Sequence, residues 1–173
     1  MKRPDAPPGF PSPSPLPVPS SDGWCEVRAH NRVMRYRRAG TGSVILMLGV
    51  ESLVLIWPEL PRLLTADFRT IVPDLPKEVD EATGWLSSLL DGLGIGRTAV
   101  LAAEPYHSTA RALAVADREK VRHVVLVHDG SGAAAIPDPN VPLLLLPRHI
   151  EADHALALTS RFLRTANPSP SSR

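Results

Sequence analysis

The chain has 173 residues, a length typical of one domain. Its 19 lysines and arginines nearly balance 18 aspartates and glutamates, and this net charge of +1 argues against a nucleic-acid binder, which would be clearly basic. Cys25 is the only cysteine, so an internal disulfide is excluded. No apolar run approaches the roughly 18 residues of a membrane span, and the start lacks the apolar region of a signal peptide. We therefore expect a cytoplasmic protein without a transmembrane segment.

Proline divides the chain into a tail and a folded part. Eight of the 19 prolines fall within the first 19 residues. Proline has a fixed φ and no N–H to donate, so residues 1–22 are predicted to be a disordered tail of polyproline II character. Residues 167–173 are polar and contain prolines, and we expect a second flexible tail there. The folded domain is thus expected over residues 23–166.

Strand-like and helix-like patterns alternate along the folded part. The pattern begins with a predicted β-hairpin, Cys25–His30 with Val33–Arg38. Five further predicted strands are Ser43–Leu48, Phe68–Val72, Thr98–Ala102, Val121–Val127 and Val141–Leu146. The predicted helices are an irregular one over Leu53–Leu64, then Val79–Leu93, Ser108–Asp117 and Ala152–Arg164. This alternation predicts an α/β fold in three layers, with a mostly parallel sheet covered by helices on both faces.

Two motifs that suggest cofactors have simpler interpretations. The glycines of Gly92-Leu93-Gly94-Ile95-Gly96 follow a helix and precede a strand, whereas a nucleotide-binding loop follows a strand and opens a helix. His149 and His154 are five residues apart, which is not the i,i+4 spacing of a zinc-binding helix. We therefore predict no cofactor and no metal.

Five arginines crowd the predicted hairpin: Arg28, Arg32, Arg35, Arg37 and Arg38. Such residues can contact phosphates, but no aromatic residues interleave with them as a base-stacking surface requires. We interpret them as a solvated face and a charged sheet edge, which prevents strands of other molecules from pairing there.

The order of elements resembles the α/β-hydrolase fold over about residues 25–165. The residues that carry the resemblance include the strand and glycine turn Val33–Gly42, the strand Val44–Leu48 and Trp57. Further along it rests on Phe68–Pro76, Leu89–Ile95, Val121–Val127 and Val141–Leu146. The resemblance implies a core of this fold, here without the family's lid, because after Gly130 only Ser131–Asn140 intervenes before the last predicted strand, Val141–Leu146.

The nucleophile position departs from the family pattern. The family's elbow is Gly-x-Ser-x-Gly, in which small residues allow a tight turn between strand and helix. An alignment without gaps places Glu104 at the nucleophile, although the family members that use a carboxylate there have aspartate. A second alignment places Ser108 there, within His107-Ser108-Thr109, and requires a deletion in the helix. The simpler interpretations are a solvated loop carboxylate for Glu104 and a helix N-cap for Ser108.

The other catalytic positions are also incomplete. Asp129 is a possible acid of a triad, and His149 is the only histidine placed to act as its base. The family's histidine near the oxyanion hole is replaced, since the stretch reads Leu48-Gly49-Val50. One family strand is missing, and the sequence leaves open whether Val141–Leu146 is the seventh or the eighth.

These losses favour a catalytically degenerate hydrolase-like domain. The missing lid and strand are expected to leave apolar surface uncovered, which usually marks a partner site. The leading hypothesis is therefore a protein-binding or structural subunit with a protein partner, or a homo-oligomer, with no catalytic residue and no nucleic acid. The alternatives are a minimal serine hydrolase with Ser108, His149 and Asp129, a Glu104 nucleophile, or a small-molecule binder in a vestigial pocket.

Overall fold

The computed structural model describes residues 23–76, 79–128 and 141–165. The two predicted tails lie outside these residues. Within these described residues, seven strands form one sheet: β1 (Cys25–Ala29), β2 (Arg32–Ala39), β3 (Ser43–Leu48), β4 (Phe68–Pro73), β5 (Thr98–Ala103), β6 (Val121–His128) and β7 (Leu143–Pro147). The helices are α1 (Val50–Ile56), α2 (Leu60–Leu64), α3 (Val79–Gly92), α4 (His107–Ala116) and α5 (Ala152–Thr165). The predicted α/β order is confirmed.

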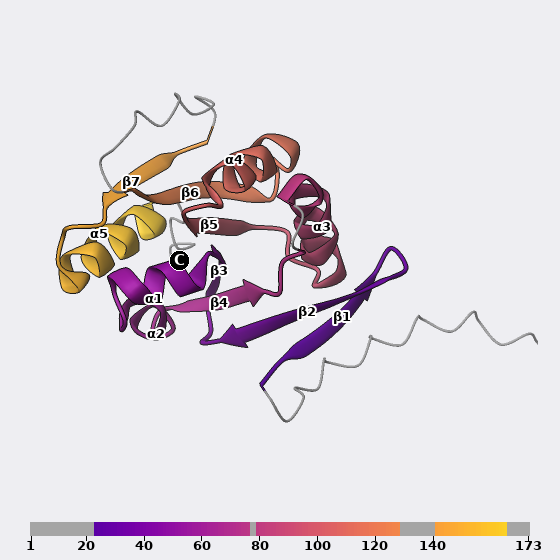
Figure 1. Cartoon of the computed structure of the whole chain (residues 1–173), viewed down its shortest axis with the longest axis horizontal. Helices are drawn as coiled ribbons and strands as arrows, with labels where there is room; N and C mark the ends of the chain where they lie inside the picture. The colour runs from indigo at the N-terminus through magenta and orange to yellow at the C-terminus, as the bar shows by residue number, and fades with distance from the viewer. Residues whose placement is uncertain (1–22, 77–78, 129–140, 166–173) are drawn as a thin grey trace, which may run out of the picture.

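The sheet has the strand order β1-β2-β4-β3-β5-β6-β7 (Figure 1). The β1–β2 hairpin is antiparallel, and β2 pairs antiparallel with β4. All the remaining neighbours are parallel, from β4 through β3, β5 and β6 to β7. The sheet is therefore mixed but mostly parallel, and its parallel part consists of apolar strands that are buried on both faces.

Alternate residues of each central strand serve two separate cores. On β3, Leu46 and Leu48 belong to the core beneath α3 and α4. Ile45 and Met47 belong to the core beneath α1, α2 and α5. This two-residue period is the reason why one short apolar strand can hold helices on both sides. The three predicted layers are thus confirmed.

The irregular helix predicted over Leu53–Leu64 is two short helices. The first ends at Trp57, and Pro58 lies in the connecting turn. The second begins at Leu60, with Pro61 in its first turn, where the missing proline N–H leaves no helical hydrogen bond unmade. Pro58 thus lies where the two helices are separated, whereas Pro61 fits within the first turn of the second helix.

The last strand, β7, is followed directly by the last helix. β7 lies directly beside β6, at the edge of the sheet. The helix that follows it, α5, packs with α2 in the core on the α1 side. β7 therefore takes the seventh place in the sheet, and the chain then continues directly into the final helix.

Candidate functional site at the carboxyl edge of the sheet

The carboxyl ends of β3, β5 and β6 meet at one edge of the sheet, the place where open α/β sheets bind ligands. A cavity of about 290 Å³ lies at this edge. Its walls come from α1, the end of β5, the end of β6 and the turn after β7: Ser52, Leu55, Ile56, Ala103, Glu104, Val127, His128 and Arg148. The site therefore combines four apolar residues with four polar side chains, one from each of these four segments.

Glu104 is the first residue after β5. The turn that follows is closed by the Tyr106 N–H, which donates to the Ala103 carbonyl at 2.9 Å. The Glu104 side chain is 71% exposed, and its carboxylate lies 2.8 Å from Nδ1 of His107. Glu104 thus stands at the strand-to-helix turn where the gap-free alignment places the nucleophile, and it is paired with a histidine.

The turn lacks a hydrogen-bond donor that acyl transfer requires. In the hydrolase fold, the amide after the nucleophile helps to stabilise the oxyanion. Here that residue is Pro105, which has no N–H. The Ser52 hydroxyl on α1 donates to the Glu104 carbonyl at 2.9 Å, so it also is engaged within the turn. With Glu104 as nucleophile, the amide half of an oxyanion hole is absent.

Gly49 sets the distance between α1 and this turn. It has φ +73°, a left-handed conformation, at the N-cap of α1. A Cβ at this position would lie 3.1 Å from the Ala103 carbonyl oxygen and 3.1 Å from Cδ2 of Tyr106. Glycine therefore satisfies both the backbone conformation and the close approach of the two chain segments.

His107 joins the turn to β6. Its Nε2 lies 2.9 Å from the Val127 carbonyl, and its Nδ1 lies 2.8 Å from Oε1 of Glu104. The Val127 carbonyl only accepts, so Nε2 must carry a proton. His107 therefore acts as a brace across the carboxyl edge.

Ser108 is the second residue of α4 and not its N-cap, so the N-cap interpretation is wrong. The helix begins earlier because the Ala110 N–H already donates to the Tyr106 carbonyl at 2.9 Å. The Ser108 side chain is exposed and lines a groove between α4 and the strands β6 and β7. It does not line the carboxyl-edge cavity described above.

The serine and histidine of the alternative triad are not joined. His149 is exposed in the turn between β7 and α5. Among the described residues, no hydrogen bond links it to Ser108. Asp129 lies outside the described residues. The structure thus brings Glu104 together with His107, a histidine that the sequence analysis assigned no role.

Two signals in the sequence point to this arrangement. Glu104 and His107 are three residues apart at the start of a helix, a spacing at which side chains meet. Pro105 directly follows the candidate nucleophile, so the sequence alone shows that this position has no amide hydrogen. Ser52 carries no such signal, because its contact with Glu104 spans 52 positions of the chain.

The described residues contain no group of three histidine, cysteine, aspartate or glutamate side chains arranged to hold a metal ion. Within the same residues, no helix combines the length and the apolar character needed to cross a membrane.

Solved structures of hydrolases are similar to this chain. An epoxide hydrolase from Vigna radiata matches 70% of the chain with 22% identity and a TM-score of 0.53. An epoxide hydrolase described from metagenomes of hot environments matches 61% of it with 22% identity and a TM-score of 0.52. The epoxide hydrolase CorEH matches 67% of it with 21% identity and a TM-score of 0.51. No family model and no curated protein matches the sequence.

The chain has the α/β-hydrolase fold. The matches cover 45%, 41% and 46% of the three structures, respectively, so the chain spans less than half of their length. What the likeness establishes is the partial core: the strands, their order and the helices on both faces.

Proposed function

We propose that this chain is a catalytically degenerate member of the hydrolase fold that works as a structural, protein-binding subunit. The observation that carries the proposal is Pro105, which removes the amide donor at the strand-to-helix turn. An ester intermediate on Glu104 needs this donor just as an acyl-serine does, because an oxyanion forms in both. The Glu104–His107 pair supports the same conclusion, since both side chains are occupied in bracing the turn.

The binding surface in this proposal is the β7 edge with the adjoining groove beside α4. Leu145 is 42% exposed on β7, and Val115 is 52% exposed on α4. The groove between these elements has a volume of about 290 Å³. The opposite edge, β1, carries the exposed charges of Glu26 and Arg28, which disfavour pairing with a strand of another molecule. The residues of β7 are instead four leucines and a proline.

The occupant that we propose is a second copy of this chain. In the described part of the chain, no strand covers the outer side of β7. Unpaired backbone groups of this kind are satisfied by another extended strand. Two copies related by a twofold axis place the same leucines opposite one another in an antiparallel pair, which is a self-complementary contact.

The mass of the full chain in solution tests this proposal. Light scattering is expected to give a dimer, and Leu145→Glu and Val115→Glu are expected to give monomers. Val33→Glu is the matched control, because Val33 is 53% exposed on the distant β2 and its replacement leaves the dimer intact. A monomeric wild-type chain, or a dimer that survives Leu145→Glu, contradicts the proposed surface.

Assays on 4-nitrophenyl butyrate and styrene oxide test the alternative activity. The expected result is no turnover above a heat-treated sample. Ester turnover that Ser108→Ala abolishes would establish the minimal serine hydrolase, and turnover that Glu104→Gln abolishes would establish a carboxylate nucleophile.

A further inference from the structure

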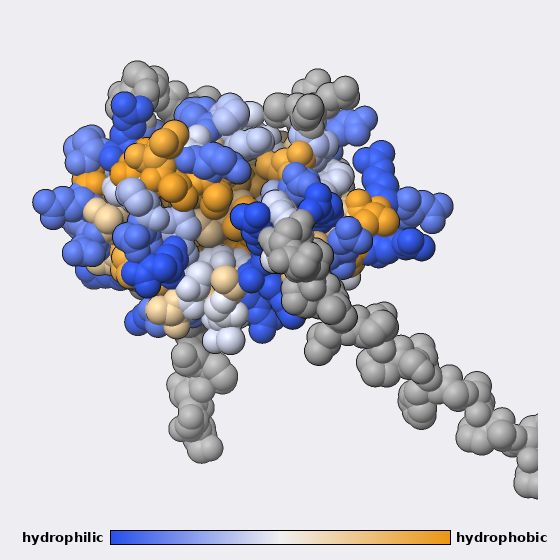
Figure 2. Space-filling view, turned by 60° about the horizontal axis from the view of Figure 1, so that its bottom comes forward, coloured by the Kyte–Doolittle hydropathy of each residue, from blue (hydrophilic) through white to orange (hydrophobic). Residues whose placement is uncertain are grey.

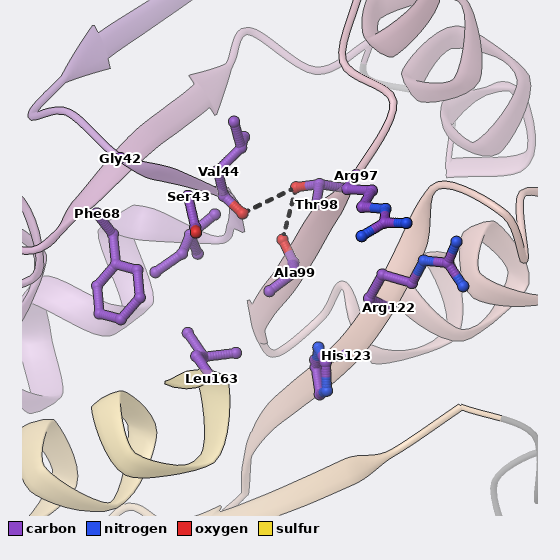
Figure 3. A pocket seen from close by; sticks show the side chains of 11 residues that line it. Gly42, Ser43, Val44, Phe68, Arg97, Thr98, Ala99, Arg122, His123 and Leu163 are labelled. Atoms are coloured by element: carbon purple, nitrogen blue, oxygen red, sulfur yellow. Dashed lines mark hydrogen bonds between the residues drawn. The ribbon is translucent and has the colours of Figure 1, made fainter. Parts of the chain in front are cut away.

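A second cavity lies at the opposite end of the sheet, where the parallel strands β3, β5 and β6 begin. It has a volume of about 240 Å³. Figure 3 shows its two ends: Phe68 and Leu163 lie on one side, and Arg97 and Arg122 lie on the other. The cavity is therefore amphipathic, with an apolar end and a basic end.

The basic end has two guanidinium groups that lack a counter-charge among the described residues. Arg97 immediately precedes β5, and Arg122 is the second residue of β6. Neither forms an ion pair within the part of the chain that the structure describes. Like charges that face one cavity repel, and an anion placed between them offsets that repulsion.

Three carboxylates on the neighbouring elements already have cationic partners. Asp67, just before β4, pairs with Arg164 of α5. Asp91 of α3 and Asp117 after α4 both pair with Lys120, at 2.6 Å and 3.5 Å. These three acids are thus engaged elsewhere, and the positive charge of Arg97 and Arg122 is left for a ligand.

His123 forms part of the wall between the two ends. It is buried, and its ring meets that of Phe162 edge to face, with the centroids 5.2 Å apart. Burial, and secondarily the charge of Arg122, lower the pKa of His123, so the ring is neutral at pH 7. A neutral imidazole offers one donor and one acceptor, which suits the oxygen of a head group without adding a third charge.

The apolar end is formed by the core of the α1 face. Ile45, Phe68 and Leu163 line it, and all three are buried. Liquid water occupies about 30 Å³ per molecule, so the cavity has room for roughly eight atoms the size of water. This size fits a carboxylate or phosphate head group with a short alkyl chain, about eight or nine non-hydrogen atoms in all.

We propose that this cavity binds a small amphipathic anion, a phosphate ester or a carboxylate, whose head group bridges Arg97 and Arg122 and whose apolar part lies against Phe68 and Leu163. Arginine suits this role because its planar fork of N–H groups matches both kinds of oxyanion. The site lies at the amino ends of the strands, and it is separate from the carboxyl-edge cavity around Glu104.

Titration of the full chain with n-butyl phosphate and with hexanoate, at pH 7 and constant ionic strength, tests the proposal by NMR. We expect saturable binding of at least one of them, with shifts of the His123 ring signals. Inorganic phosphate lacks the apolar chain, and n-butanol lacks the anionic head group. Both are expected to bind at least about tenfold more weakly. Tighter binding of butyl phosphate identifies a phosphate ester as the ligand class, and tighter binding of hexanoate identifies a carboxylate.

Substitution of the arginines locates the site. Arg97→Gln and Arg122→Gln are each expected to weaken binding about tenfold or more, since a hydrogen bond to a charged group is lost. Both side chains are exposed, so these variants keep the fold. Arg28→Gln on β1 removes the same charge from the far edge of the sheet and is expected to leave the affinity unchanged. Absence of saturation with both anions, or equal losses in all three variants, would overturn the proposal.

Discussion

Nε1 of Trp57 donates a hydrogen bond to the carbonyl of Ile150, with the two atoms 2.7 Å apart. Trp57 is the C-cap of α1 and is 3% exposed, and Ile150 lies in the turn that leads from β7 to α5. The contact spans 93 residues and fixes the end of the first helix against the start of the last. It is one direct link between the two ends of the domain on this face of the sheet.

Replacement of Trp57 by phenylalanine is expected to lower the free energy of unfolding by about 1–3 kcal/mol, because the partly buried Ile150 carbonyl loses its donor. Trp85→Phe is the matched control: Trp85 is buried on α3, and the described residues give its indole no hydrogen bond. Urea unfolding of both variants isolates the contribution of the bond. Equal losses would show that packing alone accounts for the effect.

Gly49→Ala is expected to cost about 1–3 kcal/mol of stability. The cost has two sources, the left-handed backbone and the 3.1 Å approach of the new Cβ to the Ala103 carbonyl. Gly84→Ala provides the control within α3, where a Cβ meets nothing within 4 Å. That variant is expected to gain about 0.5–1 kcal/mol, since alanine favours a helix over glycine. Denaturant midpoints that move in the same direction for both variants would contradict this account.

The Glu104–His107 pair is expected to be unequal in its contribution to stability. Glu104→Ala should cost less than about 1 kcal/mol, because its carboxylate is mostly solvated. His107→Ala should cost about 1–3 kcal/mol, because the Val127 carbonyl loses a partly buried donor. A double-mutant cycle by chemical unfolding measures the coupling between the two side chains. A larger loss for Glu104→Ala would show that the carboxylate, and not the bond to Val127, carries the brace.

Acid is expected to destabilise the fold through His123. Burial, with a smaller effect of Arg122, lowers the pKa of this histidine in the folded chain below the usual value of about 6.5. As the pH falls through that value, the unfolded chain takes up a proton that the folded chain does not yet bind. The free energy of unfolding therefore declines on acidification, until the folded histidine also titrates.

Urea midpoints at several pH values between 5 and 8 measure this slope. His123→Gln is expected to flatten it, whereas the exposed His154 of α5 is the control, and His154→Gln should leave the slope in place. An unchanged slope in His123→Gln would assign the acid sensitivity to other groups.

The sequence predicted the order of the elements because burial leaves a strong imprint on it. The run Ser43–Leu48 is buried on both faces of the sheet, and its bounds as a strand are the predicted ones. The limits of α4 were less accurate, because its first hydrogen bond starts from Tyr106, a residue with no side-chain signal of an N-cap. Burial thus leaves a pattern of apolar residues in the sequence, whereas a backbone turn such as the one at Tyr106 leaves none.

The candidate site was only partly predictable. Glu104 was identified as the residue at the nucleophile position, yet its partner His107 was not, although the two are three residues apart. The pairing depends on a turn whose geometry is set by Gly49 and Ser52, from a distant part of the chain. The Arg97–Arg122 cavity carries no local signal at all, since it forms only when β5 and β6 lie side by side.

The position of β3 has a consequence for synthesis of the protein. This strand lies between β4 and β5, and both of them follow it in the chain. A ribosome-bound chain that has emerged only as far as Asp91 carries β3 with one of its two apolar edges still open. Unpaired strand edges of this kind favour aggregation, and the emergence of β5 up to Ala103 closes this edge. A pause in translation that holds the chain with residues up to Asp91 emerged and β5 still inside the ribosome is therefore expected to reduce the yield of folded protein more than a pause after β6 has emerged.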